Sequence, residues 1–574
     1  MKSKKTGEPK NKLNLLFIFL LIAISFAVYF NSLGNGFVFD DQLLIDDQAY
    51  ILRDFKNVFS SASSFVFQDK TSAGFYRPIL VLSYFIDYHL GGGAPFSFHL
   101  TNILIHFISI ILVAYAAFMI FGEAFPALLA GSIFALHPAQ SEAVAWISGR
   151  NDPLLTVFIL LSFIFFAKYR ENNSRILLVV SIMTFLLALF TKESALIFPV
   201  VLLGYDYFNI KINSHTKEFG VGINQKRSPK YEYFLPYLLL AALIILYAVI
   251  RIFMIKGLGG GIHPGIDGLR VIPLTYLFYF KTLIYPAGFS VVPFIKTQLG
   301  GFEYLIRCLP LLFLAGLIFW LWGRIPVVAF GLWWGLLALL PVSGIIPAPI
   351  MVMEHRLYSA LFGFSLVFAW IGNSLLKQNV KLKSVIILIL GVIFFLLGGM
   401  TFQRNRLFAD PMLLWETSAR NNPNSDVIQV NLATAYIEAK KYLSAEEHLK
   451  KALELRPANE IAHYNLGYLY LLSGREKLGK KEFEKAVELD PKYIKAHYNL
   501  GIIALNDRRY REAIRRMGLI LQLKPNFVLA YITLGDAYYN LKEDIKAKEC
   551  YTRGLEIDPM NLHAQEMLKK LNIE

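Results

Sequence analysis

The stretch PANEIAHYNLGYLY (457–470) decides the fold of the C-terminal part of the chain, because close copies of it recur at a fixed interval. Related stretches begin at Pro423, Pro491 and Pro525, and a fifth proline stands at 559, so that each proline follows the previous one by 34 residues. A small residue recurs in register, within NLA (431–433), NLG (465–467), NLG (499–501) and TLG (533–535). A 34-residue period with small residues where paired helices approach predicts stacked helical hairpins.

This period and register are typical of tetratricopeptide repeats. We expect repeats over 423–456, 457–490, 491–524 and 525–558, followed by a capping helix over 559–574. Arrays of this kind form a superhelix whose concave face binds an extended peptide or another domain. A purely structural role, in which the array only holds subunits together, stays open because a fold alone does not define a function.

The chain before the repeats has the composition of a membrane protein. Over all 574 residues the mean hydropathy is +0.47, with 55% hydrophobic and 17% charged residues, whereas soluble domains are about 25% charged. Residues 1–409 carry 32 Lys and Arg against 19 Asp and Glu, and residues 410–574 carry 25 against 23. The positive charge therefore belongs to the apolar part, where cytoplasmic loops collect it, and does not indicate a nucleic-acid partner. We expect an all-α chain with two domains, a polytopic membrane domain over 1–409 and the repeats over 410–574.

Apolar segments within 1–409 predict about 11 transmembrane helices. After a first helix that begins near Leu13, they lie at 98–121, 124–138, 153–169, 175–190, 195–208, 233–255, 304–323, 325–341, 355–376 and 384–402. The short basic loops are all cytoplasmic only if the segment 271–288 does not cross, so we expect it to lie at the membrane interface. This topology places the N-terminus inside, and it places the polar loops 33–97, 139–152, 256–303 and 342–354 outside with the repeats.

The first outer loop contains two pairs of acids, Asp40–Asp41 and Asp46–Asp47, just after the first helix. Neighbouring carboxylates repel each other, which raises the pKa of at least one of them. A carboxylate tuned in this way can take the proton from an attacking hydroxyl group. Taken alone, the pairs fit a solvated acidic loop equally well. The apolar residues that precede Asp40, together with cations in the other outer loops, favour a catalytic role for Asp40 and Asp41.

Cations stand beside helix ends on the same predicted face, where the phosphate of a lipid would lie. Arginine offers two parallel donors to a phosphate, and a departing phosphate needs its charge neutralised. Each cation taken singly fits an interfacial side chain better, but together they favour a phosphate site made of Arg77, Arg150, Lys192, His355 and Arg356. We assign acceptor binding or positioning to His137, Glu142 and Glu354; a histidine that merely ends a helix is the competing interpretation for His137. Trp146 fits an interface anchor or a platform for a sugar equally well.

Other kinds of chemistry find little support in the sequence. Two cysteines, Cys308 and Cys550, are too few for a disulfide framework, and the chain contains no Walker loop, G-x-S-x-G or CxxC motif. The spacing of Asp87, His89, His99 and His106 does not match a metal site well. No cofactor is therefore predicted, although a divalent metal such as Mg²⁺ or Mn²⁺ stays open.

In order along the chain, the motifs FVFDD (37–41), FYRP (75–78), HPAQSEAVAWISGRND (137–152), TKES (191–194) and EHRLY (354–358) precede the repeats. In this combination the chain resembles the transmembrane and tetratricopeptide-repeat O-mannosyltransferases, which belong to the GT-C superfamily of multi-span glycosyltransferases. The resemblance implies transfer of a sugar from a polyprenyl- or dolichyl-phosphate donor on the periplasmic or luminal face. It also implies that Asp40 and Asp41 are catalytic and that Arg356 contacts the lipid phosphate.

The acceptor stays open between Ser/Thr of a protein bound by the repeats and a glycolipid, as in O-antigen ligases. A membrane-anchored repeat scaffold without enzymatic activity is the third interpretation. We expect a multi-pass protein of the bilayer, in a prokaryotic inner membrane or, in a eukaryote, the endoplasmic reticulum, with the repeats on the periplasmic or luminal side.

Overall fold

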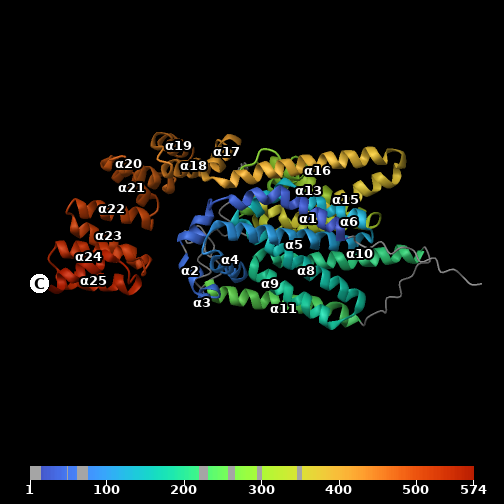
Figure 1. Cartoon of the computed structure of the whole chain (residues 1–574), viewed down its shortest axis with the longest axis horizontal. Helices are drawn as coiled ribbons and strands as arrows, with labels where there is room; N and C mark the ends of the chain where they lie inside the picture. The colour runs from blue at the N-terminus through green and yellow to red at the C-terminus, as the bar shows by residue number, and fades with distance from the viewer. Residues whose placement is uncertain are drawn as a thin grey trace, which may run out of the picture. The chain divides into compact units, whose positions relative to one another are not determined.

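The computed structural model describes residues 15–47, 49–60, 75–218, 230–255, 266–293, 300–345 and 352–573, and every secondary-structure element within these ranges is a helix (Figure 1). The all-α expectation is therefore confirmed. Clustering of contacts divides the chain into two compact units, Met1–Leu414 and Trp415–Glu574.

The first unit contains both long apolar helices and short irregular ones. The long and medium helices are α1 (Leu15–Tyr29), α4 (Pro78–Gly91), α5 (Pro95–Phe121), α6 (Ala124–Leu136), α8 (Asn151–Asn172), α9 (Arg175–Thr191), α10 (Phe198–Glu218), α11 (Lys230–Ile255), α12 (Ile266–Ile284), α13 (Gly301–Trp322), α14 (Pro326–Leu339), α15 (Tyr358–Gln378) and α16 (Lys383–Asn405). The short turns of helix are η1 (Phe30–Gly34), η2 (Gln42–Asp47), α2 (Ala49–Arg53), α3 (Phe55–Val58), η4 (Pro138–Gln140), α7 (Ser141–Ala145), η5 (Ile147–Arg150), η6 (Glu193–Ile197), η7 (Pro341–Ile345), η8 (Glu354–Leu357), η9 (Val380–Leu382) and η10 (Arg406–Ala409).

Eight helical segments of the described chain are long and apolar enough to cross a membrane, and the protein is a multi-pass membrane protein. They are Leu15–Gly34, Pro95–Phe121, Ile147–Asn172, Tyr233–Ile255, Gly301–Trp322, Pro326–Ile345, Glu354–Gln378 and Lys383–Ala409. The expected number of 11 is not confirmed. The predicted spans 124–138 and 175–190 correspond to shorter apolar helices, Ala124–Leu136 and Arg175–Thr191, and a 13-residue helix is only about 20 Å long against a hydrocarbon core of about 30 Å. The predicted span 195–208 lies mostly in α10, which is not among the eight.

The predicted interfacial segment 271–288 lies mostly in α12, which is also not one of the eight candidate spans. One face of α12 is buried, and the hydroxyl groups of Tyr276 and Tyr279 donate to the carbonyl groups of Leu336 and Met353. The position of this helix relative to a bilayer stays a prediction.

The candidate spans differ strongly in how deeply they are buried. Of the most apolar 18-residue stretch within Ile147–Asn172, 72% is buried. The corresponding share is 11% in Tyr233–Ile255 and in Lys383–Ala409. The latter two helices expose large apolar side chains such as Phe253 and Phe395, as surfaces in contact with lipid do. Helix α8 is thus a central helix, and the polar residues at its start lie inside the protein.

The second unit consists of regular antiparallel helix pairs after α17 (Pro411–Asn421). The pairs are α18 (Asp426–Glu438) with α19 (Tyr442–Leu455), α20 (Glu460–Leu472) with α21 (Glu476–Leu489), α22 (Ile494–Asn506) with α23 (Tyr510–Leu523), and α24 (Val528–Asn540) with α25 (Asp544–Ile557). Helix α26 (Leu562–Ile573) packs on α25. The first helices of successive pairs begin 34 residues apart, as the spacing of the prolines predicts.

Candidate active site

The candidate site is built around residues 137–152, all of which are buried. This segment folds into three short turns, η4, α7 and η5, before α8 begins. Its small residues allow the chain to fold back on itself: a Cβ atom at Gly149 would lie 2.6 Å from the carbonyl oxygen of Glu142. The close approach therefore requires glycine at this position. It places Gly149 directly against Glu142 of the same motif.

Asp41 is fully buried, and its carboxylate holds the loop that follows η1 against this segment. Its Oδ1 accepts hydrogen bonds from the backbone N–H of Ser148, at 2.8 Å, and from the Ser148 hydroxyl, and its Oδ2 accepts from the backbone N–H of Val38 at 3.2 Å. Burial raises the pKa of Asp41 to about 7, although these hydrogen bonds oppose the shift. Asp41 is thus built into the fold.

Asp40 is placed differently. Its side chain is partly exposed, and no described residue forms a hydrogen bond with its carboxylate. The surrounding protein and then the neighbouring Asp41 raise the pKa of Asp40 to about 7. A carboxylate with a pKa near neutrality suits a general base.

Two aromatic contacts connect this acidic turn to the EHRLY segment. Phe39, which has a positive φ of 55°, stacks on Trp146 with ring centroids 5.5 Å apart. Trp146 in turn meets the ring of His355 edge-on at 5.5 Å. The structure thereby brings together three motifs that are far apart in the sequence.

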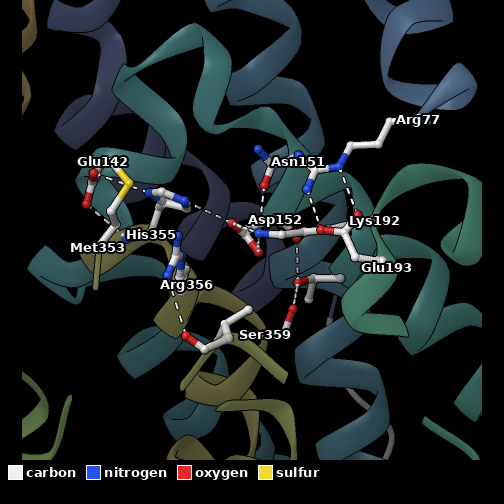
Figure 2. A network of polar contacts seen from close by, with 12 residues as sticks. Arg77, Glu142, Asn151, Asp152, Lys192, Glu193, Met353, His355, Arg356 and Ser359 are labelled. Carbon is white, nitrogen blue, oxygen red and sulfur yellow. Dashed lines mark hydrogen bonds and ion pairs between the residues drawn. The ribbon is translucent and has the colours of Figure 1, made fainter. Parts of the chain in front are cut away.

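Figure 2 shows that His355 lies between two carboxylates. Its Nδ1 is 3.2 Å from Oε1 of Glu142, its backbone N–H donates to Oε2 of Glu142 at 3.0 Å, and its Nε2 is 3.6 Å from Oδ2 of Asp152. Burial raises the pKa of Glu142 to about 7. The facing atoms Oε1 of Glu142 and Nδ1 of His355 form no hydrogen bond with a described residue.

Asp152 continues the network to Lys192. The Lys192 ammonium donates to both oxygens of Asp152 at 2.7 Å and to Oδ1 of Asn151 at 2.9 Å, and both charged side chains are buried (Figure 2). Burial lowers the pKa of Lys192, with Asp152 acting in the opposite direction.

Beside this pair, Arg77 makes a two-point contact with Glu193, with Nη2 2.6 Å from Oε1 and Nε 3.1 Å from Oε2. Burial alone would raise the pKa of Glu193, but Arg77 lowers it to about 2. Lys192 and Arg77 are thus cations held in place by buried acids.

Arg356 lies at the polar end of an open pocket. Leu155, Ile159, Phe198, Val201, Trp334 and Ala338 are among the residues that form its apolar wall, whereas Asp152, Ser194, Arg356 and Ser359 supply its polar groups. The cavity itself has a volume of only about 20 Å³, which is room for about one water molecule. A cationic side chain beside apolar ones has the chemistry that a phosphate on a hydrocarbon chain requires, but a ligand of that size would enter only after the pocket had widened.

Three other predicted site residues are engaged by the protein itself. The fully buried guanidinium of Arg150 pairs with Asp87 at 2.5 Å and donates to Asn102 and Ser83 and to the carbonyl of Phe98. This geometry favours a structural role for Arg150 over phosphate binding, because a phosphate would have to replace those partners.

His137 and Glu354 are also held by protein groups. The His137 Nδ1 accepts from the N–H of Ala139 at 3.2 Å, and its Nε2 donates to the carbonyl of Leu283 at 3.1 Å, so it caps the turn η4. Glu354 pairs with Arg404, whose Nη2 donates to the carbonyl of Pro286 at 2.6 Å. Both geometries favour positioning of the surrounding turns over direct contact with an acceptor.

The described residues contain no cluster of three or more His, Cys, Asp or Glu that could hold a metal ion. The side chains of Asp46 and Asp47 lie outside the described part of the structure.

Comparison with known proteins bears first on the repeats. Models of the tetratricopeptide repeat family match residues 433–474, 461–493, 482–515 and 528–561. Among solved structures, YrrB, a tetratricopeptide protein, is 18% identical and covers 34% of this chain and 97% of its own, with a TM-score of 0.25.

Curated relatives extend the resemblance into the membrane unit. "Protein O-mannosyl-transferase F38B6.6" of Caenorhabditis elegans is 26% identical over 495 residues, which are 80% of this chain and 65% of the relative. "Protein O-mannosyl-transferase Tmtc1" of Drosophila melanogaster is 34% identical over 30% of this chain and 21% of its own. "Protein O-mannosyl-transferase TMTC3" of Homo sapiens is 30% identical over 34% of this chain and 22% of its own. The chain is thus similar to proteins named protein O-mannosyl-transferases. The predicted resemblance is therefore confirmed, although the chain spans less than two thirds of the length of each of these relatives.

Several important groups of the candidate site were not predicted. Asp152 and Glu193 stand within the quoted motifs GRND and TKES, so their sequence neighbours were a usable signal. Asp87 and Arg404, the partners of Arg150 and Glu354, lie 63 and 50 residues away from them, and nothing local in the sequence indicates these pairings.

Proposed function

We propose that this chain is a membrane glycosyltransferase that moves a sugar, mannose or another hexose, from a polyprenyl- or dolichyl-phosphate donor to a hydroxyl acceptor. The names of the curated relatives support a protein O-mannosyltransferase-like role. The observation that carries the proposal is the juxtaposition of Asp40 with the His355–Arg356 segment through Phe39 and Trp146.

In the proposed reaction, Asp40 takes the proton of an acceptor hydroxyl as its oxygen attacks the anomeric carbon. The bond between that carbon and the phosphate oxygen breaks, and the polyprenyl phosphate leaves with the bonding electrons. A single displacement inverts the configuration at the anomeric carbon. Asp41 is assigned to holding the turn, because its oxygens are engaged by Ser148 and Val38.

We assign the donor phosphate to Arg356 and the first part of the lipid chain to the apolar pocket beside it. Lys192 and Arg77 are each paired with a carboxylate, Asp152 and Glu193, so they contribute fixed dipoles and no net positive charge. An electrostatic field that is already in place costs no rearrangement when the phosphate charge develops.

The acceptor is proposed to be Ser or Thr of a protein segment that the repeats bind. The repeats and the polar loops are proposed to lie on the periplasmic or luminal side of the bilayer.

The test uses the full chain in liposomes with polyprenyl-phosphate sugars and a mixture of Ser/Thr peptides and glycolipids. A mass increment of one hexose on peptides that disappears in Asp40→Asn, but not in the control Asp54→Asn, supports the proposal. Asp54 is a suitable control because it is an exposed aspartate of the same outer loop. An increment on the glycolipids instead would identify a lipid acceptor, and full transfer by Asp40→Asn would exclude Asp40 as the base.

Donor recognition is tested separately with Arg356→Gln and, as its control, Arg307→Gln, which removes an arginine paired on the surface of α13 with Glu303. We expect only Arg356→Gln to raise KM for the donor. An unchanged KM would exclude the phosphate role of Arg356.

A further inference from the structure

Trp146 holds a buried donor that the proposed reaction has not yet used. The residue is 4% exposed, and its indole Nε1–H has no hydrogen-bond partner among the described residues. By contrast, the indole N–H groups of Trp333 and Trp334 donate to the carbonyls of Val200 and Ser359 at 3.1 Å. Burying an unpaired donor costs free energy, so this N–H group calls for a partner that binds from outside the protein.

The position of the indole is fixed from several sides. The backbone carbonyl of Trp146 accepts hydrogen bonds from Nδ2 of Asn102 at 3.1 Å and from the N–H of Gly149 at 3.2 Å. Phe39 stacks on the ring and His355 meets it edge-on. This burial excludes the interface anchor considered from the sequence, and the stacked Phe39 already occupies the place that a sugar platform would offer on that face.

The neighbours of Trp146 indicate what its N–H group would meet. On one side, Phe39 immediately precedes the proposed base Asp40, and on the other side His355 immediately precedes the proposed phosphate ligand Arg356. In the donor, the attacked anomeric carbon is bonded to a phosphate oxygen, so in the proposed reaction the transferred sugar lies between the phosphate and the acceptor hydroxyl that the base deprotonates. A neutral N–H donor at that level matches a neutral sugar hydroxyl, whereas the phosphate has cations available.

We propose that Trp146 is a positioning residue that donates a hydrogen bond from its indole Nε1–H to one hydroxyl group of the transferred sugar. This inference rests on the proposed function. It makes Trp146 a determinant of which sugar is accepted, because only a hexose with a hydroxyl at that position satisfies the buried N–H.

The experiment is a thermodynamic cycle that combines the substitution of one side chain with the removal of one hydroxyl group from the sugar. The side-chain variant is Trp146→Phe, which keeps an aromatic ring against Phe39 and His355 and removes the N–H. The donors are a polyprenyl-phosphate mannose and its analogues deoxygenated in turn at C2, C3, C4 and C6. Trp333→Phe is the control, because it removes an indole N–H whose partner is the backbone carbonyl of Val200.

We expect Trp146→Phe to lower kcat/KM for the intact donor about tenfold. One deoxy analogue should show a similar loss with the wild type and no further loss with Trp146→Phe, while Trp333→Phe behaves as the wild type. The proposal would be overturned if, for all four analogues, the loss from the missing hydroxyl group and the loss from Trp146→Phe simply added. An unchanged kcat/KM in Trp146→Phe would also overturn it.

The same cycle measured as donor dissociation constants in liposomes distinguishes this inference from the proposed function. Non-additive binding without sugar transfer would overturn the transferase and leave the role of Trp146 supported. Sugar transfer that requires Asp40, combined with additive losses in binding, would support the transferase and overturn the role of Trp146. No binding of any donor would overturn both.

Discussion

Polar and charged side chains are buried both in the network from Glu142 to Lys192 and in the repeat array. The two regions differ in how far apart in the sequence the interacting residues are. In the repeats, His463 meets Glu482 across 19 residues, and Gln429 and His448 occupy the same places one repeat earlier. In the membrane unit, the backbone N–H of His355 reaches Glu142 across 213 residues, and no second copy of the arrangement exists among the described residues. The repeats are thus stabilised by local, recurring contacts, whereas each contact of the site is made once.

This difference predicts that substitutions in the site have larger and more specific effects than substitutions in the repeats. The largest effect is expected for Asp40→Asn. Loss of a general base lowers kcat by about 10²–10⁴, and the melting temperature should change little because Asp40 has no hydrogen-bond partner among the described residues. Transfer kinetics and thermal melting in detergent measure the two quantities.

The matched variant is Asp41→Asn, which disturbs the hydrogen bonds to Ser148 and Val38. We expect it to lower both the melting temperature and the activity. If Asp40→Asn destabilised the protein more than Asp41→Asn, the assignment of the two roles would have to be reversed.

The second largest effect is expected for Arg150→Met, and it concerns stability. Removing Arg150 leaves the buried carboxylate of Asp87 without its ion-pair partner, which costs about 3–5 kcal/mol. The yield of folded protein and its melting temperature should therefore fall. The double variant Arg150→Met/Asp87→Leu should recover part of the loss. A folded Arg150→Met with a raised KM for the donor as its only defect would instead restore Arg150 to the phosphate site.

In the repeats we expect a smaller effect from Gly535→Ala. A Cβ at this position would lie 2.6 Å from Cε1 of Tyr551, whose ring is buried and whose hydroxyl donates to Asp536. Such overpacking costs about 1–3 kcal/mol. Hydrogen exchange in the full chain should show faster opening of α24 and α25, with the peptides of residues 137–152 unchanged.

The first repeat provides the control for this substitution, because Ala433 and Leu449 occupy the places of Gly535 and Tyr551 three repeats earlier. The double variant Gly535→Ala/Tyr551→Leu should therefore recover protection from exchange. Faster exchange in residues 137–152 would contradict the independence of the two units.

The smallest effect for each group involved is the dependence on pH between about 6 and 8. Burial raises the pKa of Asp40, Asp41 and Glu142 to about 7, so in this range the folded chain binds more protons than the unfolded chain does. The stability of the membrane unit should fall as the pH rises through 7, by roughly 1 kcal/mol per pH unit for each group that titrates fully. The transfer rate should rise over the same range, because a general base must be deprotonated.

The repeats should not share this dependence. Their hydrogen bonds and charges lower the pKa of Glu446 to about 2 and that of Glu482 below its ordinary value, in each case against the effect of burial. The stability from these two groups is present above their unfolded pKa and is lost only when the pH falls well below it. Thermal melting and hydrogen exchange at pH 6, 7 and 8 compare the units; a transfer rate that fell with rising pH would contradict the role of Asp40.

The repeats show what was predictable from the sequence. The prolines and the Asn-Leu-Gly triplets give the period and the helix pairs directly, since a repeat needs only its neighbours to bury its apolar face. Eight long apolar segments were also predictable, because the length and hydropathy of a helix are local properties. The expected spans 124–138, 175–190 and 195–208 are not among the eight, and the expected number of 11 is not confirmed.

The site shows where prediction from the sequence ended. The motifs gave the residues that meet there, including Asp41, Glu142, Lys192, His355 and Arg356, but they did not give the partners. Tertiary structure decided that Asp41 is fastened to Ser148, that Arg150 faces Asp87, and that Arg356 opens onto an apolar pocket. It also left the indole N–H of Trp146 unpaired in a buried place. These outcomes depend on which of many buried charges and donors become neighbours after helices distant in the sequence have packed, and no periodic pattern in the chain encodes that choice.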